Sequence, residues 1–218
     1  MIDLRIPAGP AVLEGNLIIP DNTTALVLFV HGSGSSRHSP RNQFVARQLN
    51  NAGLATMLFD LLTSEEELLD MRTAQYRFDI RLLAERLVYA TAWAREQKQL
   101  RDFSIGYFGS STGGGAALVA AAKLPRDVGA VVSRGGRPDL AGDALPKVKA
   151  PTLLIVGGED DVVIDLNEQA RAQMLCEVKL EIVPGATHLF EEPGALERVA
   201  NLASDWFTNH IGTKRTSK

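Results

Sequence analysis

Short apolar runs alternate with longer amphipathic runs from residue 25 to near the end of the chain. The short runs have the length of buried strands, and we predict strands at 17–19, 25–30, 55–59, 103–108, 130–133, 153–156 and 178–183, with an edge strand at 4–6. Strands that alternate with helices form a mostly parallel sheet, because parallel neighbours need a crossover connection. The pattern therefore predicts an α/β protein.

The longer runs carry apolar residues at helical spacing. In the clearest one, Leu83, Leu87 and Ala90 share one face, while Arg81 and Glu85 form an i, i+4 pair on the opposite side. Helices are predicted there, over 80–94, and at 41–50, 112–123, 165–175 and 194–209. Right-handed crossovers place such helices on both faces of a sheet, so the predicted architecture is a three-layer α/β/α sandwich.

Length and composition are those of one globular domain. The chain has 218 residues, of which 45% are apolar and 22% charged, so we predict a single domain over 1–218 with a frayed tail at 211–218. The net charge of −3 provides no basic field for nucleic acid or for an anionic membrane. These values favour a small molecule as the partner.

The sequence shows no targeting or disulfide pattern. No apolar run approaches the roughly 18 residues of a membrane span, and residues 1–10, which include Asp3 and Arg5, do not resemble a secretory signal. The single cysteine, Cys176, excludes an intrachain disulfide and is interpreted as a packing residue. We therefore expect a cytoplasmic protein that binds neither a membrane nor nucleic acid.

Ser111 lies at the centre of a glycine-rich turn. The Gly-Ser-Ser-Thr-Gly segment at 109–113 connects the predicted strand at 103–108 to the predicted helix at 112–123. Such turns also serve packing or phosphate binding. Glycines two residues before and after the serine favour a nucleophile elbow, because they let neighbouring backbone approach a sharp strand-to-helix turn. The elbow exposes the serine hydroxyl at the sheet edge, beside the N-terminus of the following helix.

Two later strands are followed by acidic residues and a histidine. Glu159, Asp160 and Asp161 come directly after the strand at 153–156, and His188 comes shortly after the strand at 178–183. The chain order is therefore serine, acid, histidine. This is the order of the α/β-hydrolases, and it differs from the orders in chymotrypsin-like and subtilisin-like enzymes.

The buried strand at 25–30, which leads into His31-Gly32-Ser33-Gly34, is a further motif. Together these motifs resemble the α/β-hydrolase superfamily over about residues 17–207. The small size resembles the dienelactone hydrolase branch. Residues 134–150 are too few for the cap domain that many members insert there, so the resemblance implies an open site with 61–73 as the best candidate for a partial cover. One departure is that dienelactone hydrolases proper carry cysteine at the elbow, so dienelactone itself is not the expected substrate.

The resemblance implies a catalytic triad of Ser111, Asp160 and His188. Asp160 is preferred because the acid of the family stands three residues before a valine, here Val163, and Asp161 is the alternative. His188 is the only histidine in the segment directly after the last predicted strand, which follows the acid in the chain, whereas His210 lies at the end of the predicted last helix.

The other histidines receive different interpretations. His38 and His210 are interpreted as surface residues, whereas His31, at the end of a buried strand, is expected to brace the loop that follows it.

For the oxyanion hole, the backbone N–H of Thr112 is expected to be one donor because this residue follows the nucleophile. The resemblance implies Ser33 as the second donor, with Gly34 as the alternative. Arg134 and Arg137 flank two glycines after the strand at 130–133, at the edge where ligands bind in open parallel sheets. They are candidates for binding a substrate carboxylate, although such a segment is also typical of a solvated turn.

We therefore expect a serine hydrolase that cleaves small carboxylic esters, lactones or thioesters through an acyl-enzyme, with no metal or other cofactor. An acyltransferase or a cofactor-free perhydrolase on the same triad is an alternative, because the triad does not specify the acyl acceptor. A non-catalytic ligand-binding protein of the same fold is another alternative.

Overall fold

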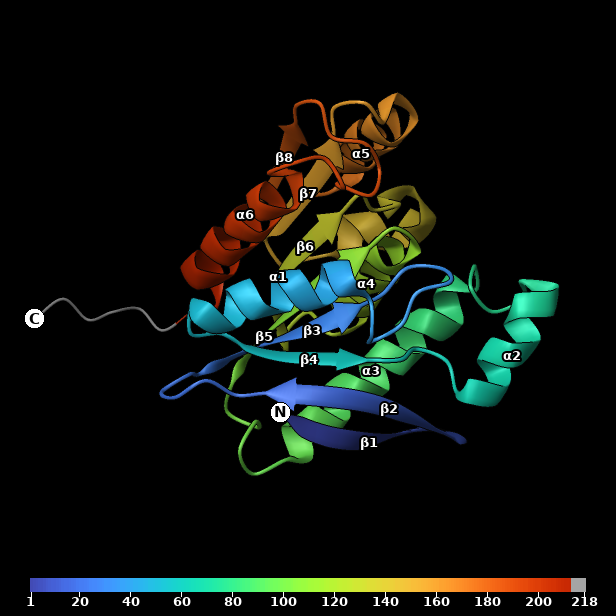
Figure 1. The fold of residues 1–218 in the computed structure, drawn as a ribbon, viewed down its shortest axis with the longest axis vertical. Helices are drawn as coiled ribbons and strands as arrows, with labels where there is room; N and C mark the ends of the chain where they lie inside the picture. Colours follow the sequence, from blue (N-terminus) through green and yellow to red (C-terminus); the bar gives the residue numbers. More distant parts are fainter. Residues whose placement is uncertain (213–218) are drawn as a thin grey trace, which may run out of the picture.

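A computed structural model describes residues 1–212 of the chain as one eight-stranded sheet flanked by helices (Figure 1). The strand order is β1-β2-β4-β3-β5-β6-β7-β8. Strands β1 and β2 form an antiparallel hairpin, β2 pairs antiparallel with β4, and all the other pairs are parallel. The strands are β1 Ile2–Ala8, β2 Ala11–Ile18, β3 Ala25–Val30, β4 Ala55–Phe59, β5 Ser104–Ser110, β6 Val128–Arg134, β7 Thr152–Gly157 and β8 Val178–Val183.

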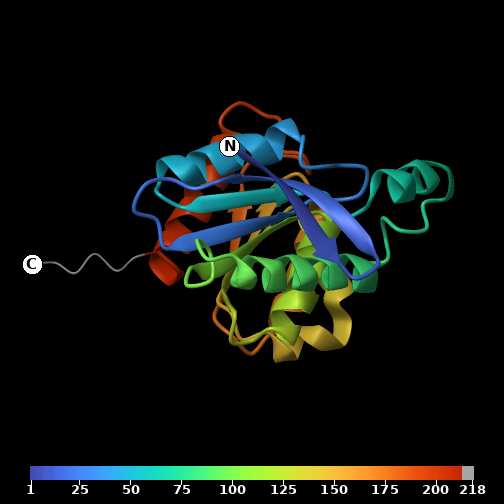
Figure 2. The ribbon, with the colours of Figure 1, turned by 90° about the horizontal axis from the view of Figure 1, so that it is seen from below.

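The helices cover both faces of this sheet, as Figure 2 shows from below. Helices α1 (Pro40–Asn51) and α6 (Ala195–His210) pack on one face. The other face is covered by α3 (Ile80–Glu96), α4 (Thr112–Lys123), the short-turn helix η1 (Pro138–Lys147) and α5 (Asp161–Gln173). The predicted mostly parallel three-layer sandwich is therefore confirmed.

Strand β3 lies near the centre of the core, and this position explains why its sequence is a continuous apolar run. Its side chains alternate between the two faces, with Leu26, Leu28 and Val30 in one apolar cluster and Ala25, Val27 and Phe29 in the other. Because helices cover both faces, all six residues of the strand are buried.

The amino-terminal hairpin extends further than predicted. Ala8 pairs with Ala11 across a turn at Gly9, whose φ of 65° is in the left-handed region that glycine tolerates. Residues 11–16 were missed because Gly15 interrupts their alternation of apolar and polar residues. A Cβ at this position would lie 3.0 Å from Cβ of Phe59 on β4, which is a tight contact.

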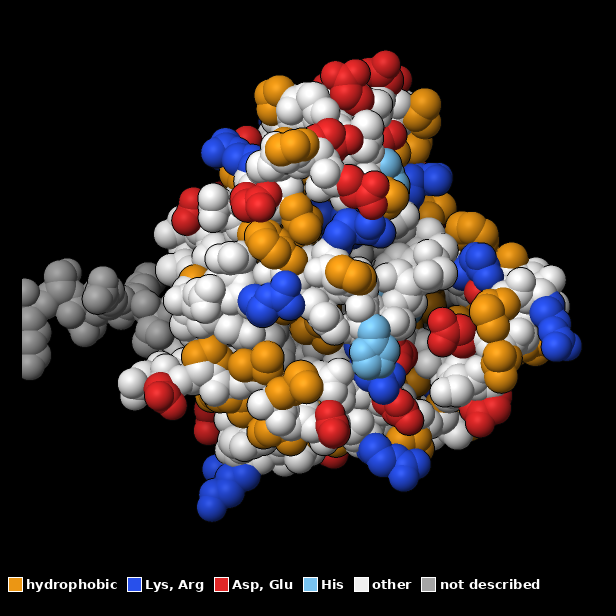
Figure 3. Space-filling model, viewed as in Figure 1, with side chains coloured by type: hydrophobic (Ala, Val, Ile, Leu, Met, Phe, Trp, Pro, Cys, Tyr) orange, Lys and Arg blue, Asp and Glu red, His pale blue; other side chains and the backbone are white. Residues whose placement is uncertain are grey.

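Two helices were not predicted. Helix α2 (Ser64–Thr73) begins with a capping box in which Thr63 and Glu66 exchange side-chain and backbone hydrogen bonds. It buries only Asp70 and lies apart from the rest of the fold, at the right of Figure 1. Hydrophobic and charged side chains are mixed on the surface of α2 (Figure 3), so its sequence carries no apolar stripe. Helix η1 was the second one missed.

The predicted start of α5 was wrong by four residues. The helix begins at Asp161 instead of residue 165, and Val162, Val163 and Ile164 are a β-branched run that favours strand over helix. Ile211, at the start of the predicted tail, is buried in the core, and residues 213–218 of that tail lie outside the described residues. Among residues 1–212, none of the helices combines the length and the apolar character needed to cross a bilayer.

Candidate active site

Ser111 has the strained backbone expected of a nucleophile elbow. Its φ of 51° and ψ of −124° place a non-glycine residue in a sparsely populated region, between the end of β5 and the start of α4. Gly109 and Gly113 are required there, because a side chain at Gly109 would lie 2.5 Å from the Gly113 carbonyl and one at Gly113 would collide with the Val30 carbonyl on β3. The Ser111 hydroxyl does not cap α4 and faces a cavity instead.

Asp160 and His188 meet at the ends of β7 and β8. The Nδ1–H of His188 donates to Oδ2 of Asp160 over 2.7 Å. This bond orients the ring and leaves Nε2 as the nitrogen that can accept a proton. Asp161 is exposed in the first turn of α5, so the structure selects Asp160 over Asp161 as the partner of the histidine.

Ser111 and His188 line one cavity of about 210 Å³ at the carboxyl edge of the sheet. Its walls come from the loop after β3 and the start of α1, from the carboxyl ends of β5 and β6, and from the segments after β5 and β8, and none of its lining residues belongs to α2. The lining residues are Gly32, Ser33, Ser35, Ser39, Arg41, Ser110, Ser111, Arg134, His188 and Leu189.

The predicted oxyanion donors differ in their surroundings. The N–H of Thr112 is in the first turn of α4, where the helix itself provides no acceptor. The N–H of Ser33 donates to Oγ1 of Thr112 over 3.1 Å. The hydroxyl of Ser33 donates to the Arg77 carbonyl over 3.2 Å. The Ser33 N–H is therefore occupied by the threonine hydroxyl in this structure, whereas the helix leaves the Thr112 N–H without an intrahelical acceptor. Gly34, the alternative donor, is exposed and lines a different cavity.

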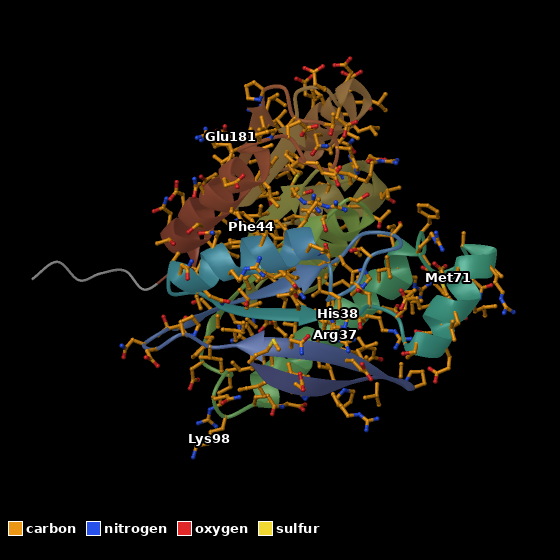
Figure 4. The ribbon with its side chains drawn as sticks, viewed as in Figure 1. Arg37, His38, Phe44, Met71, Lys98 and Glu181 are labelled. Carbon is orange, nitrogen blue, oxygen red and sulfur yellow. The ribbon has the colours of Figure 1, made fainter. Side chains whose placement is uncertain are left out.

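The segment at 61–73 stands beside the site and does not cover it. Helix α2 borders a cavity of about 40 Å³ on the other side of the loop that contains Ser33. Met71, which belongs to α2, is one of the residues that line this second cavity (Figure 4). The carboxylate of Asp70 accepts hydrogen bonds from the backbone N–H groups of Tyr76 and Arg77 and from Nε of Arg77. Burial alone would raise the pKa of Asp70, but these bonds lower it below its ordinary value.

Arg37 and His31 hold the loop after β3. Arg37 pairs with Asp60 and Glu14 and thereby ties the loop to β2 and β4, beside the exposed His38 (Figure 4). The Nδ1–H of His31 donates to the Gly32 carbonyl over 3.0 Å, while its Nε2 accepts from the Leu61 N–H over 2.9 Å. These bonds match the bracing role expected for His31 and require a neutral ring.

The stability of the protein is expected to fall with acidity through His31. Burial lowers the pKa of His31, and the bond to Gly32 and the charges of Asp60 and Glu67 only partly offset this. Below about pH 6.5 the unfolded chain binds a proton that the folded protein does not, so stability is lost as the pH falls. Urea midpoints at about pH 7.5 and about pH 5.5 should therefore differ more in the native protein than in His31→Gln.

The exposed His38 provides the control for this measurement. His38→Gln should keep the native pH dependence, because its side chain is in solvent in both states. An equal loss of stability in the native protein and in His31→Gln would contradict a buried neutral His31.

The two candidate arginines after β6 have different environments. Arg134 is 7% exposed and lines the cavity beside Ser111. Arg137 is half-buried, forms a two-bond ion pair with Asp139 and is not among the cavity residues. A solvated turn is therefore the wrong description for Arg134, which is buried. Arg137 does not line the cavity that Arg134 lines.

Several residues of this site were missed in the sequence. Arg41 and the hydroxyls of Ser35 and Ser39 line the cavity although they belong to the segment before and within α1. Asp70 and Arg77 tie α2 to the loop containing Ser33. No spacing pattern identifies them, because their positions depend on how the loops fold back over the sheet edge.

The fold and this arrangement of serine, histidine and carboxylate are those of the α/β-hydrolase class. The family model described as "Dienelactone hydrolase family" matches residues 13–211. The chain therefore belongs to the dienelactone hydrolase family. The crystal structure of a dienelactone hydrolase from Anabaena variabilis is 60% identical, with a TM-score of 0.95 over 96% of this chain and 97% of that chain.

More distant and longer relatives extend the comparison. Est1E from Butyrivibrio proteoclasticus shares the fold at 18% identity, with a TM-score of 0.78 over 95% of this chain and 98% of that chain. A Mycobacterium tuberculosis protein named a putative phosphoribosyl transferase is 56% identical over 209 residues, which cover 96% of this chain. These residues make up 46% of that protein, so this chain spans about half the length of the curated relatives it matches.

Proposed function

We propose that this protein is a serine hydrolase that cleaves small carboxylic esters, lactones or thioesters through an acyl-enzyme. The observation that carries the proposal is the strained Ser111, which shares a cavity with His188, while His188 is hydrogen-bonded to Asp160. A nucleophile, a base and an orienting acid on three separate strand ends are the parts that nucleophilic acyl transfer needs.

In the first half of the reaction, Nε2 of His188 accepts the Ser111 proton as the hydroxyl attacks the carbonyl carbon. The resulting tetrahedral oxyanion collapses as the bond to the leaving group breaks, and His188 returns the proton to that group. Water then attacks the acyl-enzyme in the same way and releases the acid and Ser111. Asp160 stabilises the charged imidazole in both halves and keeps the ring in one orientation.

The oxyanion is stabilised by the N–H of Thr112 and by the N–H of Ser33. The latter becomes available when the Thr112 hydroxyl moves aside for the substrate oxygen. One such donor contributes about 2.7–4 kcal/mol in a measured case from another hydrolase. The cavity of about 210 Å³ favours substrates with small acyl groups.

The name of the Mycobacterium tuberculosis relatives describes proteins about twice as long as the matched region. The proposed hydrolase activity concerns the part that this chain shares with them. It agrees with the family of that part, which matches over residues 13–211.

Intact mass after treatment with a neutral fluorophosphonate tests the proposal. We expect one adduct on the native protein and none on Ser111→Ala, because only an activated serine displaces the fluoride. Absence of an adduct on the native chain would contradict an assembled triad. Stoichiometric ligand binding without turnover would then support a non-catalytic binding protein.

A further inference from the structure

Helix α2 buries one side chain, and that side chain is charged. Of its ten residues only Asp70 is buried, while the apolar Leu68 and Met71 are exposed. A helix that packs against a core buries an apolar face instead. Burying a carboxylate is costly unless charged and hydrogen-bonding partners compensate for the lost water. The partners of Asp70 therefore indicate what this helix does.

The hydrogen-bond partners found for the Asp70 carboxylate lie in the segment directly after α2. Its Oδ1 accepts from the backbone N–H of Tyr76 over 2.7 Å and from that of Arg77 over 3.0 Å. Its Oδ2 accepts from Nε of Arg77 over 2.7 Å, and Nη2 of Arg77 donates to the Asp70 carbonyl over 2.8 Å. Asp70 thus holds both the backbone and the side chain of Arg77, and this fixes the direction of the Arg77 carbonyl.

The Arg77 carbonyl is bonded to the loop that follows β3. It accepts a hydrogen bond from the Ser33 hydroxyl over 3.2 Å. A serine hydroxyl carries one hydrogen and a carbonyl can only accept, so the Ser33 oxygen accepts from the Thr112 hydroxyl, 3.1 Å away. Oγ1 of Thr112 in turn accepts from the Ser33 N–H over 3.1 Å. One chain of hydrogen bonds therefore joins Asp70 to both residues whose N–H groups are proposed to stabilise the oxyanion.

Asp70 lies behind this loop and not in the cavity that contains Ser111. It lines the smaller cavity of about 40 Å³ on the other side of the loop and is not among the residues found to line the cavity of about 210 Å³. Ser33 lines both cavities. Any effect of Asp70 on the reaction must therefore pass through the loop.

From these contacts we infer that Asp70 is a positioning residue of the oxyanion hole, which it serves through the Arg77 carbonyl and the Ser33 hydroxyl. This inference rests on the proposed hydrolase function. A donor stabilises an oxyanion only when it is held at hydrogen-bond distance from the developing charge, so a small shift of the loop weakens transition-state binding. Helix α2 thus supports the site from outside it.

Asp70→Asn tests the inference. Asparagine has the size of aspartate, but its NH₂ group cannot accept a hydrogen bond, so part of the hold on Arg77 is lost. We expect kcat for p-nitrophenyl pentanoate to fall by about 10-fold, which is part of the roughly 100–1,000-fold loss that follows removal of a whole donor. KM should stay within about 3-fold, because the lost interaction is made only in the transition state. An unchanged kcat in folded Asp70→Asn would overturn the inference.

Glu66→Gln is the matched control. Glu66 also anchors α2, and the hydrogen bonds found for its carboxylate go to the Thr63 N–H and, over 2.7 Å, to the buried Arg86 of α3. Its loss should lower the urea midpoint, as should Asp70→Asn, but kcat should stay within about 2-fold of the native value. Equal losses of kcat in the two variants would overturn the inference, because general support of α2 would then explain both.

Two inhibitors with the same alkyl chain distinguish positioning from general support. When Ser111 Oγ adds to the carbonyl carbon of butyl trifluoromethyl ketone, the serine proton passes to His188 and a tetrahedral oxyanion forms, whereas pentanamide binds without charge. In Asp70→Asn the inhibition constant of the ketone should rise by the factor by which kcat falls, while that of pentanamide stays unchanged. An equal rise for both inhibitors would overturn the inference.

Ser33→Ala keeps the inference testable if Asp70→Asn does not fold. This change removes the hydroxyl and keeps the Ser33 N–H, so kcat should again fall by about 10-fold. In the double variant with Asp70→Asn the loss should not exceed that of Ser33→Ala, because both changes break the same chain of hydrogen bonds. A native kcat in Ser33→Ala, or additive losses in the double variant, would overturn the inference.

Labelling with a neutral fluorophosphonate reports the proposed function separately. One adduct on the native protein, together with a native kcat in Asp70→Asn, defeats only the inference. Absence of labelling of the native protein defeats the proposed function itself.

Discussion

Ser111→Ala is expected to lower kcat for ester hydrolysis by about 10⁴–10⁶-fold, the range found when a nucleophile of this kind is removed from another hydrolase. The methyl group of alanine cannot form the acyl-enzyme, so only attack by water remains. The elbow itself should persist, because Gly109 and Gly113 provide the close backbone approaches that shape it. The measurement is kcat for a p-nitrophenyl ester, together with the urea midpoint as a check on folding.

Ser104→Ala is the control for this variant. Ser104 is exposed at the start of β5, the strand that carries Ser111 at its other end, so its substitution should leave kcat unchanged. If Ser111→Ala retained more than about one tenth of the native kcat while folded, Ser111 would not be the nucleophile.

Asp160→Asn is expected to lower kcat by about 10⁴-fold, as in another hydrolase with a Ser-His-Asp triad. The His188 Nδ1–H now donates to the Asp160 carboxylate over 2.7 Å. An amide in its place favours the wrong tautomer of the ring and does not stabilise the imidazolium that forms when Ser111 loses its proton. The rate of fluorophosphonate labelling should fall with kcat, because both depend on an activated serine.

Asp161→Asn separates the two neighbouring acids. Asp161 is exposed on the first turn of α5, so its charge is screened by water and its loss should change kcat by less than about 3-fold. A larger loss of kcat in Asp161→Asn than in Asp160→Asn would show that the histidine changes partner during the reaction.

Much of the fold follows from local patterns in the sequence. The predicted strands at 25–30, 55–59 and 178–183 have the observed ends, and so does the helix at 112–123. The strands at 25–30 and 55–59 and the helix at 112–123 carry a clear pattern because the fold buries whole apolar runs there, whereas the strand at 178–183 is recognised by its alternation of apolar and charged residues. The hairpin at 2–18 was predicted only in part, and α2 was not predicted, because each buries one narrow face or almost none.

The class of the candidate site can be predicted from residue types and their spacing along the chain. The glycines around Ser111 are required by contacts with adjacent backbone, and the chain order of serine, acid and histidine places all three at strand ends on one edge of a parallel sheet. Both features depend on residue type and spacing, which are local properties. They also led to the dienelactone hydrolase family, which the family match over residues 13–211 confirms.

Which side chains meet at that edge depends on tertiary packing and could not be predicted from the sequence. Asp160 and Asp161 are adjacent and chemically identical, and the hydrogen bond to His188 distinguishes them because the two carboxylates point in different directions. Arg134 and Arg137 are equivalent as sequence, but one is buried in the cavity and the other is paired with Asp139. Burial and pairing depend on segments distant in the chain, whose packing no local pattern encodes.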